Sequence, residues 1–121
     1  MKDIFFVGMG GMLGSISRYL ISKNIPGIIS SFPLGIFFIN IIGCFAAGII
    51  YKFIILNKGY DSTLNLFLLI GFCGGFTTFS AFSIDAINLL NNNKIILMIT
   101  YTLLSSVIGI FFCYLGMNII K

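Results

Sequence analysis

A few uncharged hydrogen-bond donors interrupt stretches of this sequence that are otherwise apolar. Asn40 lies in the middle of one apolar run, Thr78 and Ser80 lie in a second, and Tyr101 and Ser105 stand one helical turn apart in a third. A buried amide needs up to four hydrogen-bond partners and is costly in lipid, so Asn40 indicates a structural or transport role. All five side chains can donate a hydrogen bond to an anion, and none carries a charge.

Two phenylalanines accompany these donors. Phe79 and Phe82 are three residues apart and therefore share one face of a helix. In a chain with 14 Phe, such a pair is most often ordinary packing. Its polar neighbours favour a second interpretation, because the edge of a phenyl ring is electropositive and can face an anion.

The composition decides where these residues must lie. Of 121 residues, 59% are hydrophobic and 8% are charged, and the mean hydropathy is +1.13, which excludes an ordinary water-soluble fold. We predict a single transmembrane domain over residues 1–121, an all-α membrane protein, because four apolar segments are long enough to cross a bilayer. The predicted helices are residues 4–21, 33–52, 64–90 and 94–120.

The charged residues only weakly determine the orientation of the chain in the membrane. Four spans place both termini on one side of the membrane, and the Lys and Arg count is then 4 to 3. The two groups are Lys2, Lys52, Lys58 and Lys121 against Arg18, Lys23 and Lys94. Orientation follows this asymmetry in short loops, so we predict insertion both ways round and an antiparallel, dual-topology pair. A single orientation is the alternative. Nucleic acid is not implied as a partner.

The third span combines glycines with hydroxyl residues. Gly74 and Gly75 precede Thr77 and Thr78, which makes a poor helix interior and a good place for a break near mid-membrane. Exposed carbonyls at such a break can hold a cation. The alternative is a kink whose carbonyls are satisfied by the Thr hydroxyls. Elsewhere, small residues at a spacing of four, such as Gly10 with Gly14, predict close helix packing.

Three segments together resemble the Fluc (CrcB-like) fluoride channels of bacteria: residues 10–19, 40–43 and above all 71–82. The resemblance covers essentially the whole chain. It implies a bacterial cytoplasmic (plasma) membrane protein that exports fluoride passively and so relieves its toxicity. It also implies an antiparallel dimer of four-helix subunits, two pores at the interface, and a central Na⁺ held by backbone carbonyls of the third-span break.

The resemblance also assigns roles to residues. The pore side chains would be Phe79, Phe82 and Asn40, accompanied by Thr78, Ser80, Tyr101 and Ser105; Arg18 would lie in the vestibule, and the carbonyls of Gly74 and Thr77 would hold Na⁺. Two positions depart from the family pattern: Ala81 stands where Thr is typical and Asp85 where Glu is usual. The pore residues and the charge count favour a homodimer, but a non-identical partner subunit stays open.

Other classes fit less well. A small multidrug exporter, also a dual-topology pair of four-helix chains, needs a carboxylate inside the first span for proton exchange, and residues 4–17 contain none. A membrane scaffold would leave Asn40 and the hydroxyl cluster unexplained. An enzyme is not expected, because the chain has no His and no paired carboxylates. Cys44, Cys73 and Cys113 lack metal or redox spacing, and we assign them no function.

Overall fold

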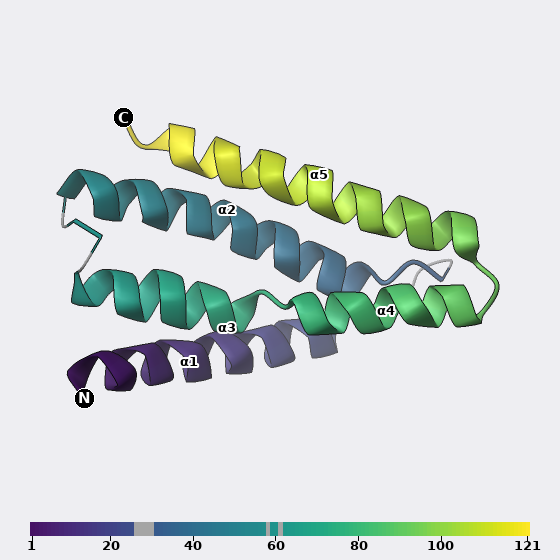
Figure 1. Ribbon diagram of the computed structural model, residues 1–121, viewed down its shortest axis with the longest axis horizontal. Coiled ribbons are helices and arrows are strands. Elements are labelled where there is room, and N and C mark those ends of the chain that lie inside the picture. Colours follow the sequence, from purple (N-terminus) through teal and green to yellow (C-terminus); the bar gives the residue numbers. More distant parts are fainter. Residues whose placement is uncertain (26–30, 58, 61) are drawn as a thin grey trace.

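The chain forms a bundle of long helices that run back and forth along one direction (Figure 1). This computed structural model describes residues 1–25, 31–57, 59–60 and 62–121, and it contains no strand in those ranges. The helices are α1 Lys2–Asn24, α2 Leu34–Asn57, the π-helix η1 Asn65–Cys73, α3 Gly74–Phe76, α4 Phe79–Asn91 and α5 Ile95–Ile119.

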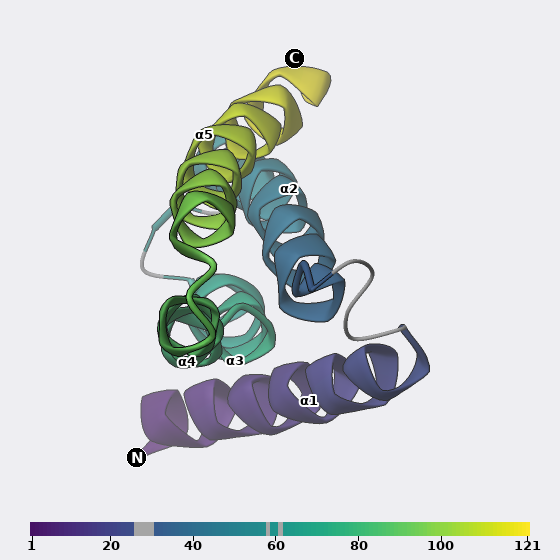
Figure 2. The ribbon, with the colours of Figure 1, turned by 90° about the vertical axis from the view of Figure 1, so that its right-hand side faces the viewer.

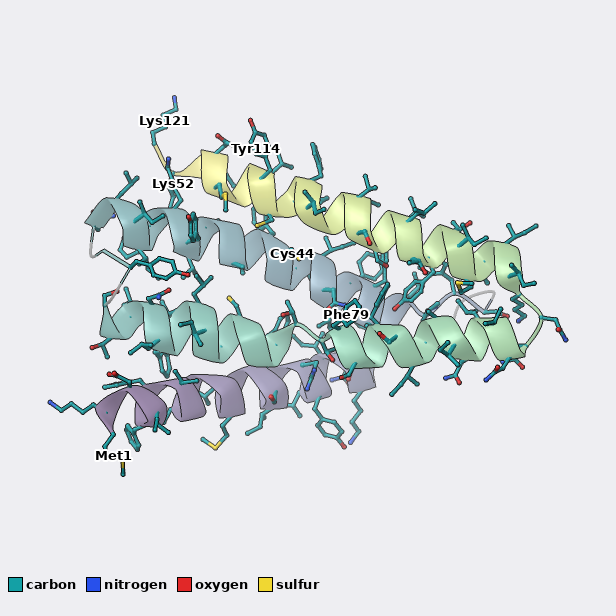
Figure 3. The ribbon with its side chains drawn as sticks, in the orientation of Figure 1. Met1, Cys44, Lys52, Phe79, Tyr114 and Lys121 are labelled. Atoms are coloured by element: carbon teal, nitrogen blue, oxygen red, sulfur yellow. The ribbon has the colours of Figure 1, made fainter. Side chains whose placement is uncertain are left out.

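Four helical segments are long and apolar enough to cross a membrane, with η1, α3 and α4 together forming the third. Both termini lie at the same end of the bundle, as four spans require (Figure 1). Met1, Lys52 and Lys121 gather at that end (Figure 3). Lys58, which the charge count assigned to that side, falls outside the described residues, as do residues 26–30 of the connector predicted over residues 22–32.

The second helix is longer than the sequence predicts. We placed its end at Lys52, but α2 continues to Asn57. The next turn stays helical because it remains apolar and because Ile54 is 1% exposed, packed inside the bundle. The Asn57 amide then donates to the Phe53 carbonyl at 3.0 Å. The single basic residue Lys52 therefore does not mark the end of the helix.

Glycines set the contact between α1 and the third segment, which Figure 2 shows crossing at an angle. A Cβ at Gly10 would lie 2.9 Å from the Phe72 nitrogen and 3.0 Å from the Gly71 Cα, which is closer than a side chain tolerates. Gly14 makes the same kind of approach one turn later. The small-residue spacing thus allows the two backbones to touch, as predicted. Gly48 and Gly116 do the same between α2 and α5.

A small buried cluster lies between α2, α4 and α5. It consists of Phe37, Ile41, Leu89 and Tyr101. Many large apolar side chains point outward instead, including Ile96 at 82% and Phe79 at 79% exposure. Such a surface is untenable in water and normal against lipid or a partner subunit.

Candidate functional site

The third segment leaves the helical conformation at two residues, Thr77 and Thr78. Thr77 has φ −76° and ψ 153°, and Thr78 has φ −148° and ψ 120°. The glycines before them stay helical: Gly74 and Gly75 lie in α3, and Gly75 is needed there because a Cβ would overlap Gly11 of α1. The β-branched pair, rather than the glycine pair, therefore carries the irregular backbone.

Asn40 of α2 holds this irregular backbone in place. Its Nδ2 donates to the Thr78 carbonyl at 3.1 Å, and its Oδ1 accepts from the Thr78 N–H at 2.9 Å. In a continuous helix the Thr78 N–H would bond to the Gly74 carbonyl. Because Asn40 takes this donor, the Gly74 carbonyl is released from helical pairing. One N–H of the Asn40 amide remains for another acceptor.

Hydroxyls satisfy part of the break. The Thr77 Oγ1 donates to the Cys73 carbonyl at 2.9 Å, as a kink stabilised by Thr would require. Thr78 is the N-cap of α4: its Oγ1 accepts from the Ala81 N–H at 3.3 Å and lies 3.1 Å from the Ser80 Oγ. The start of α4 is thus capped by a side chain, and a Thr hydroxyl satisfies one carbonyl of the preceding turn.

A pocket of about 270 Å³ opens beside the break. It is lined by Asn40, Cys44, Thr77, Thr78, Phe79, Phe82, Ser105 and Ser106. Figure 3 shows Phe79 directly after the irregular stretch, with Cys44 on the neighbouring helix. Most of the predicted pore residues therefore meet in one place, although they come from three different helices.

Aromatic rings and the Ser105 hydroxyl form part of the wall of this pocket. The rings of Phe79 and Phe82 lie 5.6 Å apart and tilted by 35°. Phe82 is 5.1 Å from the ring of Tyr101. The Ser105 Oγ is buried and has no hydrogen-bond partner in the part of the chain that the structure describes, so a donor is available in the pocket wall.

Tyr101 and Arg18 occupy other surroundings. Tyr101 is fully buried, and its hydroxyl donates to Asp85 Oδ2 at 3.4 Å. It therefore supports the pocket through the Phe82 ring, with its hydroxyl directed to Asp85. Arg18 lies half-buried on α1 and is not part of the pocket lining.

Two lining residues were not among our candidates. Cys44 lies one turn after Asn40 on α2, and Ser106 follows Ser105 on α5. Helical spacing from Asn40 is a signal that could have identified Cys44. For Ser106 the sequence offers no comparable signal.

These observations define a class of protein: a multi-pass helical membrane protein with a pocket of uncharged donors and phenyl rings beside an interrupted helix. Residues 5–117 match the family described as CrcB-like protein, Camphor Resistance (CrcB), and the chain belongs to that family. It is similar to curated proteins named fluoride-specific ion channel FluC. One from Flavobacterium psychrophilum is 38% identical, covering 100% of this chain and 98% of the relative. One from Gloeothece citriformis is 41% identical with the same coverage, and FluC 2 of Clostridium acetobutylicum is 42% identical over 94% of each chain. The chain is thus a multi-pass protein of the bacterial plasma membrane.

Proposed function

We propose that this protein is a fluoride-selective ion channel that lets F⁻ leave the cell passively. The observation that carries the proposal is the pocket beside the break, where Asn40, Ser105, Phe79 and Phe82 converge and none of the described lining residues is charged. The names of the curated relatives, fluoride-specific ion channels, support it over the full length of the chain.

The chemistry of the pocket suits a small, strongly hydrated anion. A selective pathway must replace the water around fluoride with donors at close range, while staying too narrow for chloride. Neutral donors serve this better than a fixed cation, because conduction requires binding that is favourable enough to enter and weak enough to leave. The unpartnered Ser105 hydroxyl and the remaining Asn40 N–H are such donors. Phe79 and Phe82 would line the narrow part.

The working unit is an antiparallel dimer, with pores at the interface between subunits. Three features support it. The Lys and Arg count of 4 to 3 gives little preference for one orientation. Four helices hardly enclose a pathway on their own. Phe79 is 79% exposed in the single chain, and a second copy would cover this polar-flanked ring better than lipid would.

A Na⁺ ion would sit at the centre of this dimer, at the mid-membrane break. The carbonyls of Gly74 and Thr77 would hold it, since carbonyls of unwound helices coordinate Na⁺ in membrane proteins. The residues fit this role: Asn40 removes the helical partner of the Gly74 carbonyl, and Gly74 is exposed with nothing within 4 Å of its Cβ position. The ion would offset anion repulsion in the middle of the assembly.

The proton-coupled multidrug exporter is not supported. Its carboxylate would have to lie inside α1, where the sole acidic residue is Asp3 in the first turn. Asp85, the other candidate, lies on α4 and accepts a hydrogen bond from Tyr101.

The test is fluoride efflux from liposomes that contain only this purified chain. A fluoride electrode follows the efflux after valinomycin sets the membrane potential, and chloride-loaded liposomes are the control. We expect fast fluoride efflux without chloride efflux. Folded protein that passes no fluoride would leave a missing, non-identical partner subunit as one explanation, which co-expression with a second family member from the same genome checks. Equal efflux of both anions would reject selectivity.

A further inference from the structure

A second pocket, of about 460 Å³, lies at the end of the bundle away from the termini. Its wall is largely apolar, with hydroxyls from Ser22 and Ser31 and amides from Asn88 and Asn92. Two lining residues are charged: Asp85 and Lys94. Among the described lining residues, Lys94 alone carries a positive charge.

This outer pocket is connected to the pocket beside the break through a chain of contacts. Asp85 lines the outer pocket and accepts the Tyr101 hydroxyl at 3.4 Å. The Tyr101 ring lies 5.1 Å from Phe82, which lines the inner pocket. The contact between the Tyr101 and Phe82 rings thus links a residue of the outer pocket, Asp85, to a residue of the inner one, Phe82.

The structure also fixes where the Lys94 charge lies. Its backbone N–H donates to the Leu89 carbonyl at 2.9 Å, which anchors the residue at the N-cap of α5. Its Nζ donates to the Ser31 hydroxyl, and Ser31 has a left-handed φ of 72° that turns the chain just before α2. The hydrogen bond between the Lys94 ammonium and Ser31 thus joins two loops that are far apart in sequence and that both line the pocket.

A carboxylate in the wall of an anion pathway repels the permeating ion, so Asp85 needs a compensating charge nearby. We infer that Lys94, tied to Ser31, is the residue that attracts fluoride to the outer pocket and offsets Asp85 there. This inference rests on the proposed channel function. Lys94 lies at the wide mouth, beyond the Tyr101 and Phe82 rings, where a cation raises the local anion concentration without trapping the ion.

The test measures fluoride efflux from the same liposomes at several ionic strengths, set with potassium gluconate. Lys94→Gln should lower efflux about three- to tenfold at ~10 mM salt and less than about twofold at ~300 mM, because the Debye length shrinks from ~30 Å to below ~10 Å. Lys94→Glu should lower it further, and Lys94→Arg should restore it. Ser31→Ala keeps the Lys94 charge but removes the hydroxyl that holds the ammonium in place. We therefore expect it to lower fluoride efflux less than Lys94→Gln does.

The matched control is Lys121→Gln, which removes the same charge from a residue that is not among those lining the outer pocket. Each variant is used only after it elutes as the parent does, and Lys94→Arg with Lys94→Glu keep the test decisive if Lys94→Gln folds poorly. Efflux that falls equally at every ionic strength, or equally for Lys121→Gln, would overturn the role of Lys94. A parent chain that passes no fluoride at any salt would instead reject the channel function and this inference with it.

Discussion

Replacing Asn40 by Ala should lower the free energy of unfolding more than replacing an exposed asparagine such as Asn118. In Asn40→Ala the N–H and the carbonyl of Thr78, a residue 9% exposed, both lose their partner. Each buried polar group left without a hydrogen-bond partner lowers the free energy of unfolding by about 1–3 kcal/mol. Water that enters the adjacent pocket can recover part of this, so we expect a loss of about 2–4 kcal/mol in the free energy of unfolding.

The assay is reversible unfolding in mixed micelles of sodium dodecyl sulfate and dodecylmaltoside, followed by circular dichroism. Asn118→Ala is the matched control, since Asn118 on α5 is exposed and donates only to the Tyr114 carbonyl one turn away. It should change stability by less than about 0.5 kcal/mol. Asn40→Asp keeps an acceptor for the Thr78 N–H but places a carboxylate oxygen against the Thr78 carbonyl, so it should be at least as destabilising as Asn40→Ala.

The same variants separate a structural from a conducting role. Asn40→Asp puts a negative charge into the pocket and should abolish fluoride efflux even when most of the protein is folded. If Asn40→Ala were as stable as Asn118→Ala, the amide would not hold the break, and the reasoning about Thr78 and the released Gly74 carbonyl would be refuted.

Three further predictions concern the pore, the helix packing and the cation. Phe79→Ile should abolish fluoride efflux while the protein still elutes as a dimer. The control is Phe111→Ile, which should conduct normally because the Phe111 ring on α5 points outward. A Phe79→Ile variant that still conducts would show that the Phe79 ring does not line the pore. Gly10→Val should prevent α1 from packing on η1 and lower the yield of folded protein several-fold, whereas Gly8→Val should fold, because nothing lies within 4 Å of its Cβ position. Replacing all Na⁺ by N-methylglucamine should slow efflux or dissociate the dimer, as measured by electrode and by light scattering; no change in either would argue against a cation on the Gly74 carbonyl.

The sequence predicts the main architecture of this protein because the bilayer imposes it. Charge-free runs longer than 20 residues leave little choice but helices, and an even number of spans brings both termini together. Glycine spacing likewise predicts close helix packing, since only small residues let backbones approach, but it does not predict that α1 meets the third segment. The helix ends are less well determined: Lys52 stops the charge-free run but not the helix, because Ile54 still packs inside.

The site is predictable in its residues but not in their connections. Asn40 and the Thr77–Thr78 segment stand out as polar groups in apolar surroundings, so the sequence identifies them. That Asn40 bonds to the backbone of Thr78, and that Tyr101 turns its hydroxyl to Asp85, depends on tertiary packing between helices distant in sequence. Local patterns carry no information on such pairings, and the same holds for Lys94 as a lining residue of the outer pocket.

Current recordings in a planar bilayer test the central claim most directly. With unequal potassium fluoride on the two sides, balanced by potassium chloride to equal total potassium, the purified protein should carry current that reverses at the fluoride equilibrium potential, without dependence on a pH gradient. A reversal potential set by chloride or potassium would contradict fluoride selectivity. Transport that appears only with a proton gradient and a cationic drug would contradict passive conduction and would support a proton-coupled exporter instead.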